Sequence, residues 1–168
     1  MKKSTFFKSA SLALACAAAT AAFSGCGSKN YAENNTAFFI GASGPLTGSA
    51  ASYGIAVQRG AELAVEEINA KNEDGMRFTF EIKDDKASAA DVPTNFAALY
   101  EKGMQLSLGA VTSGACLSFK GLAAEKNLFT LCPSATADDV TKDADTVFQM
   151  CFSDSNQGTV AAQQYFNT

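Results

Sequence analysis

The sequence predicts an α/β fold built on a doubly wound parallel sheet, with helices on both faces. Three observations support this class. From residue 37 to residue 168, short apolar runs alternate with segments of helical period, the links between them are short, and Gly, Ser and Thr follow the apolar runs. Such alternation is typical of parallel sheets, whose ligands bind outside the carboxyl ends of the strands.

The first predicted strand and the first predicted helix differ in how their apolar residues are spaced. Residues 37–42 are a short, almost wholly apolar run, which predicts a buried strand. Residues 54–71 place apolar side chains at helical spacing instead, and we expect these to face the sheet: Val57, Ala61, Ala64 and Ile68.

The second predicted strand alternates with period two. In residues 77–84 the apolar side chains share one face: Phe78, Phe80 and Ile82. A strand that is apolar on one face only suits the edge of the sheet. Residues 91–102 then form a helix, with Pro93 tolerated in its first turn and Gly103 ending it.

The second half continues the alternation. The predicted strands are residues 105–111, 128–131 and 146–150. The predicted helices are residues 116–126 and 156–166.

Small and polar residues follow every predicted strand. These segments are Ser43 to Gly48 with Ser52 to Gly54, Asp84-Asp85, Thr112 to Gly114, Pro133 to Thr136, and Ser153 to Gly158. In a parallel sheet they converge on one edge, where free N–H groups at helix starts attract anions. A small carboxylate is the simplest ligand for such an edge.

Composition argues against several other functions. The chain has no His, which excludes Ser-His triads and most zinc sites. It has no basic run, as nucleic-acid binding would need, and the Gly44 to Gly48 segment lacks the Lys of a phosphate loop. Asp84-Asp85 fits a metal site or a turn, and the turn is the better fit. We therefore predict no enzyme activity, no cofactor and no metal.

The N-terminus has the pattern of a lipoprotein signal. Lys2, Lys3 and Lys8 precede an apolar, Ala-rich stretch at residues 10–23, and Phe23-Ser24-Gly25-Cys26 resembles a bacterial lipobox. We predict a signal peptide at 1–25, lipidation of Cys26 and a flexible tether at 26–36. Cleavage would leave 10 basic and 17 acidic side chains, a net charge of −7. The alternatives are an ordinary secretory signal or a buried Ala-rich helix.

An ordered set of motifs resembles the branched-chain amino-acid-binding proteins of ABC transporters. The set comprises Gly41 to Pro45, Tyr53-Gly54, Gly60 to Ala64 with Ile68 to Ala70, Asp84-Asp85, Gly109 to Gly114, Pro133 to Thr136, and Asp154 to Gly158. The resemblance implies the type I periplasmic-binding-protein fold, in which two α/β lobes close on a ligand. It also implies that residues 37–168 are an incomplete N-terminal lobe, without the second lobe.

The resemblance also assigns roles to individual residues. Ser113 and Thr136 match the positions that hold the ligand carboxylate, and Thr136 also meets the ammonium group. Ser134 matches a carbonyl that accepts from the ammonium, with Ala135 beside it in the same loop. Three further positions match walls of the pocket: Tyr53, Val111 and Thr112. The implied partners are an amino acid, ABC permease subunits and, through the lipid, the outer face of the bacterial membrane.

The sequence also allows alternative interpretations of these residues. Ser113 and Thr136 also fit helix caps, and Tyr53 fits a packing residue. The fold also serves non-transport sensor domains. Of the cysteines beyond Cys26, one pair among Cys116, Cys132 and Cys151 fits a disulfide.

Overall fold

The protein folds around five parallel strands in the order β2-β1-β3-β4-β5. This computed structural model describes residues 37–71 and 75–166, so the predicted signal peptide, Cys26 and tether lie outside the described residues. The strands are β1 (Ala37–Gly44), β2 (Arg77–Asp84), β3 (Leu106–Ala110), β4 (Thr130–Cys132) and β5 (Val147–Gln149). The predicted edge position of residues 77–84 is confirmed, because β2 pairs with β1 alone.

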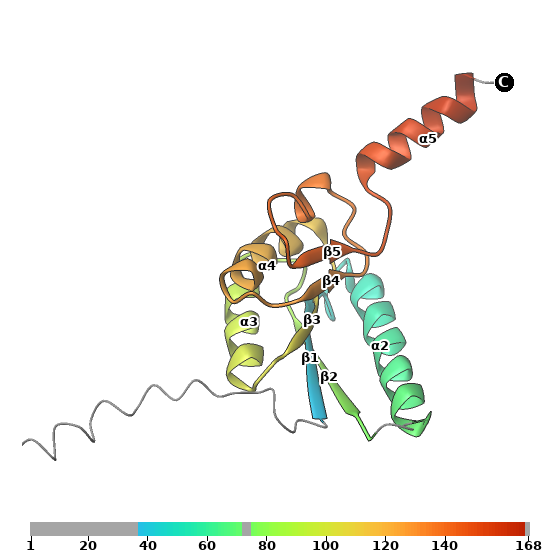
Figure 1. The fold of residues 1–168 in the computed structure, drawn as a ribbon. Helices are drawn as coiled ribbons and strands as arrows, with labels where there is room; N and C mark the ends of the chain where they lie inside the picture. The colour runs from blue at the N-terminus through green and yellow to red at the C-terminus, as the bar shows by residue number, and fades with distance from the viewer. Residues whose placement is uncertain (1–36, 72–74, 167–168) are drawn as a thin grey trace, which may run out of the picture. The chain divides into compact units, whose positions relative to one another are not determined.

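Helices cover both faces of this sheet (Figure 1). The helices are α2 (Ala51–Lys71), α3 (Val92–Glu101), α4 (Ser113–Glu125) and α5 (Asp154–Phe166), with a 3₁₀ turn, η1, at Asp138–Val140. Helices α3 and α4 lie on one face and α2 lies on the other. The predicted doubly wound α/β class is therefore confirmed. No helix within 37–71 and 75–166 combines the length and apolar character needed to cross a bilayer.

The larger core lies between the sheet and the pair α3 and α4. Phe119 is its largest fully buried side chain, and its ring meets the edge of Phe96 with centroids 5.0 Å apart. The aliphatic part of this core includes Val92, Leu99, Met104, Leu128, Val140 and Val147. Burial of this apolar surface is the main force that holds the two helices on the sheet.

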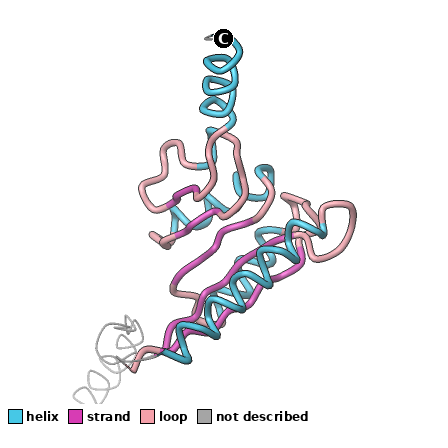
Figure 2. Tube along the Cα trace, turned by 90° about the vertical axis from the view of Figure 1, so that its right-hand side faces the viewer, coloured by secondary structure: helices cyan, strands magenta, loops and turns pink. Residues whose placement is uncertain are grey.

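The opposite face has a smaller core, in which Val57 of α2 packs against Ala42, Ile82 and Val111. Figure 2 shows α2 lying along the strands of this face. The predicted inward face of α2 is wrong in its second half, because Ile68 is 51% exposed. Asn69 instead faces the sheet: its side chain donates to the Phe78 carbonyl and accepts from the Phe78 N–H, both at 2.8 Å.

Several element boundaries differ from the predicted ones. Helix α2 begins at Ala51 rather than residue 54, and α4 begins at Ser113 rather than residue 116. The fourth strand is shifted toward the C-terminus and ends at Cys132. The signals at α3 are confirmed, because Pro93 lies in its first turn and Gly103 follows it with a φ of 93°.

Two glycines of α2 give a matched test of how closely this helix packs. A Cβ at Gly54 would lie 2.0 Å from the backbone oxygen of Pro45, whereas a Cβ at Gly60 would meet open space. We expect Gly54→Ala to lower the free energy of unfolding by about 1–3 kcal/mol, the usual cost of overpacking. Gly60→Ala should raise it by about 0.5–1 kcal/mol, because alanine favours a helix interior. Urea denaturation of both variants checks this, and equal effects of one sign would refute the close contact.

Candidate functional site

The segments that follow the strands form two hydrogen-bonded clusters at the carboxyl edge of the sheet. One cluster joins the loop after β1 to the end of β2 and the loop after it, and the other joins the start of α4, the loop after β4, and the end of β5 with the loop after it. This arrangement agrees with the parallel pairing of all five strands. The two clusters differ in chemistry, because carboxylates organise the first and neutral groups organise the second.

Asp84 organises the first cluster. Its carboxylate accepts from the N–H of Leu46 at 2.8 Å, from the hydroxyl of Thr47 at 2.6 Å and from the N–H of Lys86 at 2.9 Å. Desolvation is the largest single influence on its pKa and raises it, but these hydrogen bonds together outweigh it and lower the pKa. Asp84 therefore fixes the loop that leads from β1 into α2.

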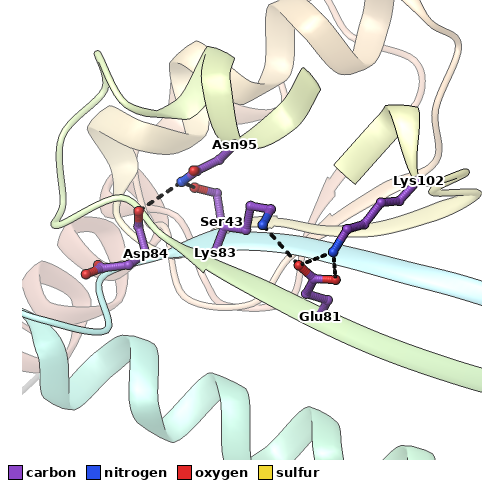
Figure 3. Close-up of polar contacts among 6 residues, drawn as sticks. All are labelled: Ser43, Glu81, Lys83, Asp84, Asn95 and Lys102. Atoms are coloured by element: carbon purple, nitrogen blue, oxygen red, sulfur yellow. Dashed lines mark hydrogen bonds and ion pairs between the residues drawn. The ribbon is translucent and has the colours of Figure 1, made fainter. Parts of the chain in front are cut away.

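Asp85 is the buried partner in this cluster. It accepts from the Ser43 hydroxyl and from the Ala87 N–H, each at 2.9 Å. Asn95 of α3 donates to Ser43 Oγ at 3.1 Å and to the Asp84 carbonyl at 3.0 Å, as Figure 3 shows. Burial raises the pKa of Asp85. Asp84 ends β2 and Asp85 begins the turn that follows it, which the Ser88 N–H closes by donating to the Asp85 carbonyl at 2.7 Å. Within residues 37–71 and 75–166 no group of three or more His, Cys, Asp or Glu is arranged to hold a metal ion.

An ion-pair group lies on β2, before the turn that follows this strand. Glu81 accepts from Lys83 at 3.1 Å and from Lys102 at 2.7 Å (Figure 3). The hydrogen bond from Lys102, followed by that from Lys83, lowers the pKa of Glu81. All three side chains are partly exposed, so we expect a modest contribution to stability, at most about 1 kcal/mol for each pair.

The second cluster brings Ser113 and Thr136 together. Ser113 Oγ accepts from the N–H of Thr136 at 3.3 Å and from the N–H of Ala137 at 3.4 Å. The helix-cap interpretation of both residues is wrong. Thr112 is the residue at the cap of α4 and Ala137 is the one at the cap of η1, and neither makes a side-chain cap hydrogen bond. A hydroxyl and two N–H groups thus meet at the start of a 13-residue helix.

The last residue of β5 and residues that follow this strand hold the loop that carries Thr136. Gln149 Nε2 donates to the carbonyls of Ala135 at 2.8 Å and Ala137 at 3.1 Å. Cys151 Sγ also donates to Ala135, at 2.9 Å, and the Asp154 N–H donates to the Thr136 carbonyl at 2.8 Å. Gln149 is not among the site residues predicted from the sequence. The available signal was weak: a polar side chain in a short strand that is otherwise apolar.

The three predicted wall residues occupy different environments. Val111 is 1% exposed and packs against Ala42 and Ile82, so its side chain lies in the core behind the edge. Thr112 directly precedes Ser113, and its hydroxyl is buried without a hydrogen-bond partner among the described residues. Tyr53 lies in the first turn of α2, not in a loop, and is 63% exposed.

The three cysteines of this region are free thiols. Cys116 is fully buried and donates to the Ala110 carbonyl at 2.7 Å. Its hydrogen bond with Cys132, together with burial, raises the pKa of the Cys116 thiol far above the usual range. A protonated, buried thiol is a poor nucleophile, so Cys116 is a packing residue in this structure.

Sequence comparison connects this arrangement with known proteins. The sequence profile of the family described as periplasmic binding protein matches residues 37–168. The chain is 36% identical over 126 residues to the Leu/Ile/Val-binding protein BraC3 of Rhizobium johnstonii, an alignment that covers 74% of this chain and 34% of that protein. The chain therefore spans about a third of the length of this relative.

Solved structures show the same relationship. The branched-chain amino acid transporter substrate binding protein LivJ of Streptococcus pneumoniae, in complex with isoleucine, has a TM-score of 0.67 and 36% identity, over 71% of this chain and 35% of that one. An ABC transporter substrate-binding protein of Desulfitobacterium hafniense, in complex with Leu, has a TM-score of 0.65 and 25% identity, over 77% of this chain and 39% of that one.

Proposed function

Because this chain belongs to the periplasmic binding protein family, a class of solute-binding proteins, we propose that it binds an α-amino acid of the branched-chain type for uptake by an ABC transporter. The observation that carries the proposal is the meeting of Ser113 Oγ with the N–H groups of Thr136 and Ala137. Relatives named for Leu, Ile and Val binding, and a structural neighbour that holds isoleucine, support the choice of ligand class.

The chemistry of the second cluster suits an α-carboxylate. A carboxylate is a stronger acceptor than a hydroxyl, so it would take the N–H groups of Thr136 and Ala137 from Ser113. The Ser113 hydroxyl would then rotate and donate to the same carboxylate. The start of α4 adds a favourable dipole. Each hydrogen bond to a charged group contributes about 1.5–3 kcal/mol.

The remainder of the ligand would lie around this point. In the proposed arrangement the Thr136 hydroxyl and the Ser134 carbonyl accept from the ammonium group. The backbone at Val111, the side chain of Thr112 and the exposed ring of Tyr53 would bound the aliphatic side chain. The proposed mode of action is reversible binding without catalysis, followed by delivery to ABC permease subunits.

A ligand series tests the proposal. We expect calorimetry to detect binding of L-leucine, L-isoleucine or L-valine, and at least tenfold weaker binding of 3-methylbutan-1-amine, which matches leucine without its carboxylate. The factor follows from the loss of bonds to a charged group, worth about 1.5 kcal/mol or more. Equal affinity for leucine and the amine, or no binding of any branched-chain amino acid, would overturn the proposal.

We also propose that the mature protein is a lipoprotein, anchored outside the cytoplasmic membrane through Cys26 and the tether at 26–36. The support is the sequence pattern at Phe23 to Cys26 together with a family of extracytoplasmic binding proteins. In a bacterial host, we expect Cys26→Ala to remain unprocessed or to leave the detergent-soluble membrane fraction. Cys151→Ala is the control and should behave like the wild type. Identical processing and fractionation of Cys26→Ala would refute the anchor.

A further inference from the structure

We propose that Gln149 is a positioning residue, which aims the Thr136 N–H at the carboxylate subsite. The inference rests on the proposed function and extends it to a residue of β5 that does not itself touch the ligand. Its basis is a pair of hydrogen bonds on either side of Thr136: Gln149 Nε2 donates to the carbonyl of Ala135 at 2.8 Å and to that of Ala137 at 3.1 Å.

The planar peptide bond couples the direction of the Ala135 carbonyl to that of the Thr136 N–H. In a trans peptide the C=O of one residue and the N–H of the next point in opposite directions, and the described residues contain no cis peptide. When Gln149 holds the Ala135 carbonyl, the N–H of Thr136 must therefore point away from Gln149. On that side lies Ser113 Oγ, at 3.3 Å.

The next peptide is held in the same way. The N–H of Asp154 donates to the Thr136 carbonyl at 2.8 Å, so the N–H of Ala137 points to the opposite side and reaches Ser113 Oγ at 3.4 Å. Two consecutive N–H groups thus point at one hydroxyl, because the carbonyl on the opposite side of each peptide plane accepts a hydrogen bond. Gln149 differs from Asp154 in acting through its side chain, which makes its role accessible to mutation.

The register of the sheet explains why Gln149 is the residue in this place. Gln149 ends β5 and pairs with Cys132, the last residue of β4. The loop that carries Thr136 begins at the next residue, so the Gln149 side chain needs to reach only three to five residues beyond its own partner. Both of its N–H donors are used, which leaves the amide little freedom to release either carbonyl.

Gln149→Met is the test, because methionine keeps the length and removes both donors. Cys151→Ala is the matched control, because it removes only the weaker thiol donor to the same Ala135 carbonyl. In ligand-free protein we expect Gln149→Met to shift the ¹H and ¹⁵N resonances of Thr136 and Ala137 and to speed their amide exchange, while amides of β1 and β3 are unchanged. Cys151→Ala should have a smaller effect.

The affinity of each variant for L-leucine is the second measurement. We expect Gln149→Met to weaken L-leucine binding about three- to tenfold, the scale of one ordinary hydrogen bond, and Cys151→Ala to weaken it less. A lower melting temperature with unchanged Thr136 resonances and unchanged leucine affinity would reduce Gln149 to a structural role and overturn the inference. Failure of the wild type to bind leucine would overturn the proposed function instead, and the ligand-free resonances would still report whether Gln149 orients the loop.

Discussion

Replacement of Phe119 by alanine is expected to lower the free energy of unfolding by about 3–5 kcal/mol. The ring is 0% exposed and lies between α4, α3 and the sheet. Without the ring, the protein loses the transfer free energy of a buried aromatic side chain and the edge contact between Phe119 and Phe96. Removal of the ring also leaves a cavity that the close-packed surroundings fill only in part.

Urea denaturation followed by circular dichroism measures this loss. Phe166→Ala is the matched control, because the Phe166 ring is 88% exposed and its removal should change stability by no more than about 0.5 kcal/mol. A loss below about 1 kcal/mol at Phe119 would mean that α4 does not pack on the sheet as described.

Ser113→Ala is expected to weaken binding of L-leucine by about 1.5–3 kcal/mol, or roughly 10- to 150-fold in Kd. The variant removes a donor to the carboxylate in the complex. The free protein loses two long contacts in which Ser113 Oγ accepts, from the N–H of Thr136 at 3.3 Å and of Ala137 at 3.4 Å, so its stability should fall by about 1 kcal/mol at most.

Ser118→Ala provides the comparison, since Ser118 lies in the same helix beyond the cluster. Calorimetric titration of both variants gives the two affinities, and thermal melts give the two stabilities. A Ser113 variant that melts earlier but binds leucine like the wild type would confine Ser113 to a structural role.

Much of the fold was predictable because each element carries its own local pattern. The period-two strand at residues 77–84 and the stop at Gly103 depend on neighbours in sequence, and both were confirmed. The start of α4 was not predicted correctly, because Ser113 and Gly114 read as loop residues in isolation. The inward face of α2 was misassigned because apolar residues occur on more than one side of this helix, and only contact with β2 selects one of them.

The site was predictable only where chain topology alone places residues together. Ser113 and Thr136 follow neighbouring parallel strands, so their proximity is a consequence of the sheet order. Gln149 depends on the register between β4 and β5, which no local pattern of a three-residue strand specifies. Likewise, the burial of Val111 depends on packing against β1 and β2 rather than on its own sequence neighbours.

The most direct test of the central claim is an NMR titration of ¹⁵N-labelled protein with L-leucine, which locates binding residue by residue even when affinity is weak. We predict that the largest shift changes fall on the amides of Thr112, Ser113, Thr136 and Ala137, and that 3-methylbutan-1-amine at the same concentration causes much smaller changes at these amides. Shift changes centred elsewhere, for example on the pocket between Phe152 and Val160 of α5, with the Ser113 and Thr136 resonances unchanged, would contradict the proposed site.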